Sequence, residues 1–329
     1  MTPIERIVVR APNWIGDVVL SLGAVRDLRR NFPAARIEML ARPWVSALYE
    51  AVAEVDAVRP SAGIRADARS LRGAFDAAVL LPNSFASALP VWQANIPHRW
   101  GYATDLRGPL LTRAGRVPDA VRGRSQVYYY RAMLAAVGLT VSATPDASLA
   151  CPPEWGSHGD ALLGGDGPWI GLNPGAFYGT AKRWIPERYA AVGDTLARRT
   201  GSRVAIVGGA AERVLGQSIA AAMLEPARVL CGETSLADLT GVLSRLRVLV
   251  TNDSGPMHLA AALGVPVVAI FGPTDERETG PVGDAHRIVR EPVHCSPCKL
   301  RECPIDHRCM TRIGIDRVVA EAQGMLARD

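Results

Sequence analysis

The chain has 329 residues, of which 48% are hydrophobic and 21% are charged. This length exceeds the usual size of one hydrophobic core and the composition is that of a globular protein, so we expect two domains and exclude disordered, collagen-like and coiled-coil chains. No apolar run reaches the roughly eighteen residues that a membrane-spanning helix needs, and the N-terminal segment lacks the features of a signal peptide. We therefore expect a cytoplasmic protein.

The net charge of +5 is unevenly distributed. Residues 1–150 contain 18 arginines and 12 acidic residues, a balance of +6, whereas residues 151–329 contain 19 basic and 20 acidic residues, a balance of −1. Seven arginines fall within 33 residues that contain only two acids: Arg99, Arg107, Arg113, Arg116, Arg122, Arg124 and Arg131. Guanidinium groups in this number suit a phosphorylated or carboxylated partner, with a solvated surface as the alternative. No nucleic-acid-binding motif accompanies them, so we expect no nucleic-acid partner.

The N-terminal half alternates strand-like and helix-like segments. The β-branched run at 5–11 predicts a buried strand, and the spacing of Val18, Leu22 and Val25 predicts a helix after it. Further strand-like runs follow at 36–42 and 76–82, each before a helical pattern. This alternation predicts a mainly parallel sheet covered by helices.

A second half of the same kind follows a stretch rich in proline and glycine between residues 143 and 168, which predicts a domain boundary near residue 160. The predicted strands of this half are 169–175, 203–209, 247–253 and 266–272, and its predicted helices are 186–199, 211–224 and 236–246. A last helical pattern begins at Asp316. The predicted division is therefore 1–160, 161–315 and 316–329.

Polar residues follow the carboxyl ends of several predicted strands, where ligands of open α/β sheets bind. Asp17 follows the first strand at the predicted start of a helix, where a carboxylate can cap the helix or act as a general base. Lys182 is one of only two lysines and follows the strand 169–175 in a loop of small residues. We expect it to neutralise a phosphate.

The segment TNDSGPMHLAAALG runs from a strand into a helix through Asp253, Ser254 and Gly255. The free N–H groups of such a helix start suit a diphosphate, although the same residues also make a good N-cap. His258 lies in this helix, either supporting a ligand or simply packed. Neither GxxxxGK[ST] nor GxGxxG is present, which excludes a P-loop and the dinucleotide fingerprint of a nicotinamide dehydrogenase.

Cysteines gather near the C-terminus beside two histidines: Cys295, Cys298, Cys303, Cys309, His294 and His307. A zinc site is chemically feasible there. The spacings match no well-defined zinc finger, and cytosolic thiols are usually reduced and unpaired, so reduced thiols without metal remain the alternative.

Four segments together resemble the ADP-heptose:lipopolysaccharide heptosyltransferases of glycosyltransferase family 9, most of all those of type II. They are RAPNWIGDVVLSLGAVRDLRRNFP, LNPGAFYGTAKRW, TNDSGPMHLAAALGVPVVAIFGPTDERETGP and CSPCKLRECPIDHRCM. The resemblance covers nearly the whole chain. It implies an α/β protein of GT-B architecture, in which two Rossmann-like domains with mainly parallel sheets face a central cleft. The acceptor would bind to residues 1–160 and the ADP-sugar to 161–315, and the helix 316–329 would pack back on the first domain.

The resemblance also implies roles for single residues. Asp17 matches the general base that deprotonates the acceptor hydroxyl in an inverting transfer. Lys182 matches the lysine on the ADP diphosphate. The remaining donor contacts that it implies are Ala176, Thr180, Glu212 on the ribose, the phosphate- and sugar-binding turn Asp253, Ser254 and Gly255, and His258 supporting that turn. In the basic N-terminal half, we expect Arg122 and Arg124 to contact the acceptor.

The implied reaction moves L-glycero-D-manno-heptose from ADP-heptose to the first heptose of the Kdo-bearing lipopolysaccharide inner core, at the cytoplasmic face of the inner membrane, which the protein would contact peripherally. No cofactor or metal is expected, since no DxD motif occurs in a suitable loop and the resemblance implies a metal-independent mechanism. The alternatives are a family 9 heptosyltransferase with a different acceptor, a nucleotide-sugar 2-epimerase of the same fold, and a non-catalytic sugar-nucleotide-binding module.

Overall fold

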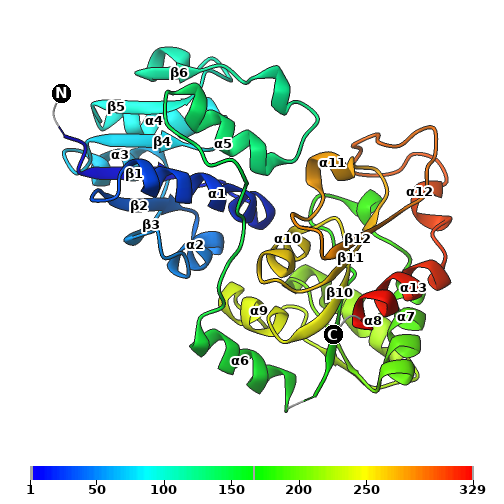
Figure 1. The fold of residues 1–329 in the computed structure, drawn as a ribbon. Helices are drawn as coiled ribbons and strands as arrows, with labels where there is room; N and C mark the ends of the chain where they lie inside the picture. Colours follow the sequence, from blue (N-terminus) through cyan, green and yellow to red (C-terminus); the bar gives the residue numbers. More distant parts are fainter. Residues whose placement is uncertain (1–2, 166, 328–329) are drawn as a thin grey trace. The chain divides into compact units, whose positions relative to one another are not determined.

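The computed structural model describes residues 3–165 and 167–327 and divides into two compact units between Ala147 and Ser148. Each unit contains a six-stranded sheet whose neighbouring strands all pair in parallel, with helices between the strands (Figure 1). Both units are therefore Rossmann-like, as predicted. No helix among the described residues is long and apolar enough to cross a membrane.

The first unit alternates strands and helices from its start. Its strands are β1 (Arg6–Arg10), β2 (Arg36–Ala41), β3 (Ala57–Pro60), β4 (Ala77–Leu80), β5 (His98–Tyr102) and β6 (Arg113–Gly115). Its helices are α1 (Ile15–Asn31), α2 (Pro43–Glu50), α3 (Ile64–Leu71), α4 (Phe85–Gln93) and α5 (Gln126–Ala136), with the 3-10 helices η1 (Gly108–Leu110) and η2 (Asp119–Val121). The strand order is β3-β2-β1-β4-β5-β6.

The second unit repeats this alternation. Its strands are β7 (Trp169–Asn173), β8 (Arg203–Ile206), β9 (Ala227–Val229), β10 (Leu246–Asn252), β11 (Val267–Phe271) and β12 (His286–Arg290). Its helices are α6 (Pro153–Leu163), α7 (Pro186–Thr200), α8 (Arg213–Ala222), α9 (Leu236–Leu243), α10 (Gly255–Ala262), α11 (Glu276–Thr279), α12 (Arg308–Thr311) and α13 (Ile315–Leu326), with η3 (Thr180–Lys182) and η4 (Ala210–Glu212). The strand order is β12-β11-β10-β7-β8-β9.

Central strands are apolar on both faces because helices cover both sides of a parallel sheet. Every residue of β4, β7 and β11 is buried. β1 pairs in register with β2 and β4, with Val8 opposite Glu38 on one side and Ala78 on the other. The continuous apolar runs in the sequence therefore predicted the middle of each sheet correctly.

The boundary predicted near residue 160 falls inside α6, so the division between units comes earlier in the chain. The division still lies within the predicted connecting stretch 143–168, whose later prolines and glycines delimit α6. Pro153 occupies its first turn and Gly164 ends it in the left-handed region at φ 78°. Gly159 packs so closely on Gly241 of α9 that an added Cβ would lie 2.4 Å from the Gly241 carbonyl carbon, which places α6 in the second unit.

The C-terminal helix α13 is an integral part of the second unit. Its apolar side chains Val318, Ala322 and Met325 belong to the core formed with the second sheet. Arg199 of α7 also donates a hydrogen bond to Gln323. The described residues of α13 therefore bury their apolar face in the second unit, and packing of residues 316–329 on the first domain stays a prediction; residues 328–329 lie outside the described part of the chain.

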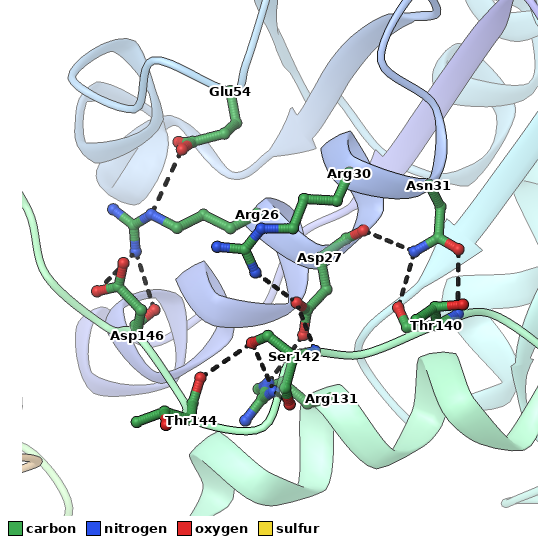
Figure 2. Close-up of polar contacts among 10 residues, drawn as sticks. All are labelled: Arg26, Asp27, Arg30, Asn31, Glu54, Arg131, Thr140, Ser142, Thr144 and Asp146. Atoms are coloured by element: carbon green, nitrogen blue, oxygen red, sulfur yellow. Dashed lines mark hydrogen bonds and ion pairs between the residues drawn. The ribbon is translucent and has the colours of Figure 1, made fainter.

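In the first unit a polar network joins α1, α5 and the segment after α5 (Figure 2). Buried Asp27 of α1 accepts hydrogen bonds from Arg131 of α5 at 2.8 Å and from the backbone N–H of Ser142 at 3.0 Å. Arg30 pairs with the same carboxylate at 2.8 Å. Because Arg131 follows Tyr130 directly, this network fixes where Tyr130 lies relative to α1.

Candidate functional site

Asp17 lies in the first turn of α1, just after β1, as the sequence predicted. Its carboxylate accepts a hydrogen bond from the Tyr130 hydroxyl of α5 at 3.1 Å. Among the described residues no backbone N–H donates to it, so the capping role considered from the sequence is not the one observed. A half-buried carboxylate that faces a phenol remains available as a base.

The electrostatic surroundings of Asp17 suit proton acceptance. Burial raises the pKa of the Asp17 carboxyl, and the hydrogen bond from Tyr130 partly offsets this rise. Burial, together with the Asp17 charge, raises the pKa of Tyr130 well above its usual range, so the phenol stays protonated and donates. A higher pKa makes an ionised carboxylate a stronger base at neutral pH.

The seven arginines of the N-terminal half do not form one ligand-binding surface. Arg107 is fully buried and donates hydrogen bonds to the Tyr102 carbonyl and the Ser87 hydroxyl. Arg131 is buried against Asp27, and Arg99 donates to the carbonyl of Leu110. These arginines hold loops and helices together, which composition alone could not distinguish from a binding role.

Arg122 and Arg124 are exposed, in the turn between η2 and α5. Arg122 pairs with Asp119, another exposed side chain, at 3.1 Å. The Arg124 guanidinium lies over the Tyr128 ring, 4.0 Å from its centroid. Both cations precede the helix that carries Tyr130, and solvent-exposed guanidinium groups at that place can reach an anionic ligand.

In the second unit, Lys182 and Asp253 form a buried ion pair in which the lysine Nζ lies 2.6 Å from Oδ2 of the carboxylate. Lys182 is only 9% exposed. The same Oδ2 accepts hydrogen bonds from the hydroxyls of Thr274 at 2.6 Å and Thr279 at 3.1 Å. Asp253 therefore holds the lysine in place, and Asp253 is itself held by Thr274, in the loop after β11, and by Thr279, the last residue of α11.

A second polar cluster joins the ends of β7 and β10. The side-chain amide of Asn173 donates to the hydroxyls of Thr251 at 2.8 Å and Ser254 at 2.7 Å. The amide of Asn252 donates to the carbonyl of Pro174 at 2.7 Å. The sequence pointed to Ser254 but not to Asn173, whose position at the last residue of a buried strand was the signal available.

α10 begins directly after this cluster, with Gly255 as its first residue and proline in its first turn. Ser254 occupies the N-cap position without a side-chain cap, so backbone N–H groups of the first turn keep capacity for a ligand. His258 is buried one turn further on, and its Nδ1 has no hydrogen-bond partner among the described residues. Burial lowers the pKa of His258 to about 4, so the ring is neutral at pH 7.

Glu212 lies against the backbone that follows β7. Its Oε2 accepts a hydrogen bond from the Gly209 N–H at 2.8 Å. A Cβ added to Gly175 would fall 1.8 Å from Oε1 of Glu212, so the carboxylate fills the space that glycine leaves. In the loop that follows, Ala176 is buried, whereas Thr180 is exposed at the start of η3.

The cysteine-rich segment supports the loop that carries Lys182. The Arg301 carbonyl accepts a hydrogen bond from the Ala181 N–H at 2.9 Å, and the His307 ring nitrogen lies 2.6 Å from the Ala181 carbonyl. The Tyr178 hydroxyl donates to the Lys299 carbonyl at 3.0 Å. These bonds fix η3 from outside the sheet.

All six cysteines are free thiols. Within residues 3–165 and 167–327, no group of three or more histidine, cysteine or acidic side chains is arranged to hold a metal ion. Burial and the neighbouring thiols of Cys303, Cys295 and Cys298 raise the pKa of Cys309 to about 11. The described residues thus give the zinc site no support.

The residues that sequence reasoning missed are Tyr130, Asn173, Thr274 and Thr279. Tyr130 is 113 positions from Asp17 and only tertiary packing joins them. The two threonines lie in GPTDERETGP, whose place after a predicted strand was the available signal.

Comparison with known proteins places this chain among sugar transferases. The model of glycosyltransferase family 9 (heptosyltransferase) matches residues 64–308. The chain is 34% identical over 307 residues to lipopolysaccharide heptosyltransferase 2 of Salmonella typhimurium, with 87% of this chain and 88% of the relative covered. It is 32% identical to lipooligosaccharide heptosyltransferase 2 of Haemophilus influenzae, with 86% and 88% covered. Among solved structures, the ADP-heptose lps heptosyltransferase II of Escherichia coli matches with a TM-score of 0.86 and 31% identity, over 98% of this chain and 99% of that one.

Proposed function

Since the chain belongs to glycosyltransferase family 9, the heptosyltransferases, and has their GT-B fold, we propose that it moves L-glycero-D-manno-heptose from ADP-heptose to the first heptose of the lipopolysaccharide inner core. This is the heptosyltransferase II reaction. The two curated relatives and the solved structure described above match over most of their length and carry that name, which favours this acceptor over those of other family members.

The observation that carries the proposal is the buried Lys182–Asp253 pair next to the start of α10. A diphosphate needs a cation and N–H donors, and the second unit offers both within one cluster. Asp253 positions the lysine, and Ser254 and Gly255 supply the turn at the helix start. Lys182 then stabilises the negative charge that develops on the departing ADP.

The rest of the donor is assigned to the loops around this cluster. Glu212 accepts hydrogen bonds from the ribose hydroxyls through the carboxylate oxygen that faces Gly175. The backbone around Ala176 and Thr180 lies against the donor, and neutral His258 supports the diphosphate-binding helix from its buried side.

Asp17 is the proposed general base. It takes the proton of the acceptor hydroxyl while that oxygen forms a bond to the anomeric carbon of the donor heptose. The bond between the anomeric carbon and the β-phosphate oxygen breaks, and its electron pair leaves with ADP. Attack opposite to the leaving group inverts the anomeric configuration. Arg122 and Arg124 bind anionic groups of the acceptor.

We also propose that the protein works at the cytoplasmic face of the inner membrane as a peripheral protein. The acceptor is anchored in lipid, and the described chain has no helix that could cross a membrane. We propose that surface side chains make the contact with the bilayer.

The proposal is tested by incubating the protein with ADP-heptose and two truncated lipopolysaccharide acceptors, one without heptose and one with a single heptose. ADP release and product mass are measured. We expect one heptose to be added to the one-heptose acceptor only. Turnover on the heptose-free acceptor alone would move the assignment to heptosyltransferase I, and no turnover on either acceptor would contradict the proposed reaction.

A further inference from the structure

The first unit has a hollow on the outer side of α3 and α4, made of residues that the proposed reaction does not use. Its volume is about 410 Å³, and it is lined by Arg65, Arg69 and Arg72 of α3 and its C-terminal end, and by Trp92, Gln93 and Asn95 around the end of α4. The inner sides of the same helices are apolar and pack on the sheet through Leu71, Ala88 and Val91. The hollow is therefore a surface feature of a well-packed helix pair.

The three arginines follow one another along α3 at a spacing of four and three residues, which places them on one face of the helix. All three are exposed, and among the described residues no carboxylate forms an ion pair with them. Within the described part of the chain, Arg72 is the one of the three whose side chain donates a hydrogen bond, to the Gln93 carbonyl at 3.2 Å. The acid of this helix, Asp67, is buried and bonded to the Ser61 hydroxyl and the Ala62 N–H. The hollow thus presents the positive charge of three guanidinium groups that no described carboxylate neutralises.

An indole completes the hollow. Trp92 is 45% exposed, and Trp14 and Trp44 of the same unit are 54% and 60% exposed. Ile64, at the start of α3, is a further exposed apolar side chain. Tryptophan combines an apolar body with an N–H donor and is enriched where protein meets the polar region of a bilayer. Arginines beside a tryptophan suit the surface of an anionic bilayer, where the arginines can pair with headgroup phosphates and the indole can contact the apolar region below them.

None of the residues that line the hollow is among those assigned to the proposed reaction. In a parallel sheet the helices run opposite to the strands, so the C-terminal end of α4 lies toward the edge where strands begin. Asp17 follows the carboxyl end of β1, at the other edge. A ligand of Trp92 and Asn95 is therefore not the sugar that Asp17 would deprotonate.

From these observations we infer that the α3–α4 hollow binds the phosphate headgroups of anionic phospholipids and holds the first unit on the membrane surface. This inference extends the proposed function, because it assigns peripheral attachment to α3 and α4 instead of to the arginine-rich stretch 99–131. Each arginine near an anionic bilayer strengthens binding by roughly fivefold, and the indole adds contact with the interface.

The test compares sedimentation of the full chain with vesicles of phosphatidylcholine alone and of phosphatidylcholine with phosphatidylglycerol. We expect binding to the second kind only, weakened roughly 30-fold in the double variant Arg65→Gln/Arg69→Gln, since two arginines are lost. Trp92→Ser should weaken it as well. The control is Arg198→Gln/Arg312→Gln, which removes the same charge from exposed positions of the second unit and should bind like the unaltered protein.

Three results would overturn the inference: equal vesicle binding by the Arg65/Arg69 variant and the unaltered protein, equal losses in that variant and the control, and displacement from vesicles by soluble glycerol phosphate at low concentration, which would indicate a site for a free phosphate. Turnover on a lipid-free acceptor should be unchanged in the Arg65/Arg69 variant. Failure of the proposed reaction would instead appear as missing turnover in the unaltered protein, whatever its vesicle binding.

Discussion

At the scale of single residues, the hydrogen bond from Tyr130 to Asp17 favours the proposed general base over a helix cap. Burial raises the pKa of the Asp17 carboxyl and the Tyr130 hydroxyl lowers it. We therefore expect the phenol to be a positioning residue that orients the carboxylate and lowers the pH above which Asp17 can accept a proton.

Tyr130→Phe removes this hydrogen bond and keeps the ring. The pKa of Asp17 should rise further, so the acidic limb of the kcat/KM profile should move to higher pH while activity recovers well above that limb. A pH–rate profile measures this. Tyr128→Phe, on the same helix but without a bond to Asp17, should leave the limb in place. If the acidic limb does not move in Tyr130→Phe and activity is lowered equally at every pH, Tyr130 has a structural role only.

Lys182 has a natural control, because the chain contains only one other lysine. Lys182→Met should raise the KM for ADP-heptose and lower kcat, with kcat/KM falling roughly 10- to 100-fold, the cost of one charged hydrogen-bond partner. Lys299→Met, which breaks a pair with Glu278 at 2.5 Å, should change neither constant by much. Thermal unfolding of both variants shows whether the fold is intact. Unchanged donor kinetics in folded Lys182→Met would remove this lysine from the diphosphate site.

At the scale of elements, the contact between α1 and α5 depends on a buried ion pair. The side chains of Arg131 and Asp27 are 6% and 1% exposed, and Nε of Arg131 lies 2.8 Å from Oδ2 of Asp27. Without Arg131 the Asp27 carboxylate would keep Arg30 and the Ser142 N–H as partners but lose the cation that joins it to α5.

We expect Arg131→Met to lower the free energy of unfolding by about 3 kcal/mol, because breaking a buried pair leaves a charge that is poorly compensated. Arg116→Met, at an exposed position of the same arginine-rich stretch, should change it by less than about 0.5 kcal/mol. Denaturant titration measures both values. Equal effects of the two substitutions would mean that the pair does not hold α5.

The elements also show what the sequence could and could not predict. Apolar runs such as β7 and β11 were predictable because both faces of a parallel sheet are covered. The places of Asp17, in the first turn of the helix after β1, and of Asp253, directly after β10, were predictable because each follows such an apolar run. The exact division between the two units was not predictable, because the prolines and glycines that delimit α6 resemble those of the connecting segment before it. The partners of Asp17 and Asp253 depend on tertiary packing, which no local pattern contains.

At the scale of the whole molecule, His258 links the candidate donor site to stability. In the unfolded chain a histidine has a pKa of about 6.5, and burial lowers that of His258 to about 4. Between these pH values the unfolded state binds a proton that the folded state excludes. The free energy of unfolding therefore falls as the pH drops through this window, by up to about 3 kcal/mol, and His258 contributes no pH dependence above it.

His258→Gln should remove most of this acid sensitivity, which is measured as unfolding free energy against pH. His286, whose pKa is also lowered by burial, leaves a smaller dependence of the same sign. His294→Gln, which removes a histidine from an exposed position, serves as the control. A slope in His258→Gln equal to that of the unaltered protein would contradict the assignment of His258 as a buried neutral ring.

The central claim is that Asp17 deprotonates the acceptor in transfer from ADP-heptose, and Asp17→Asn tests it most directly because the substitution keeps the size of the side chain and removes the base. Product formation on the one-heptose acceptor and calorimetric ADP binding are measured for both proteins. The account predicts that turnover falls by roughly 10²- to 10⁴-fold while ADP affinity stays within about twofold. Turnover of Asp17→Asn close to that of the unaltered protein would contradict it.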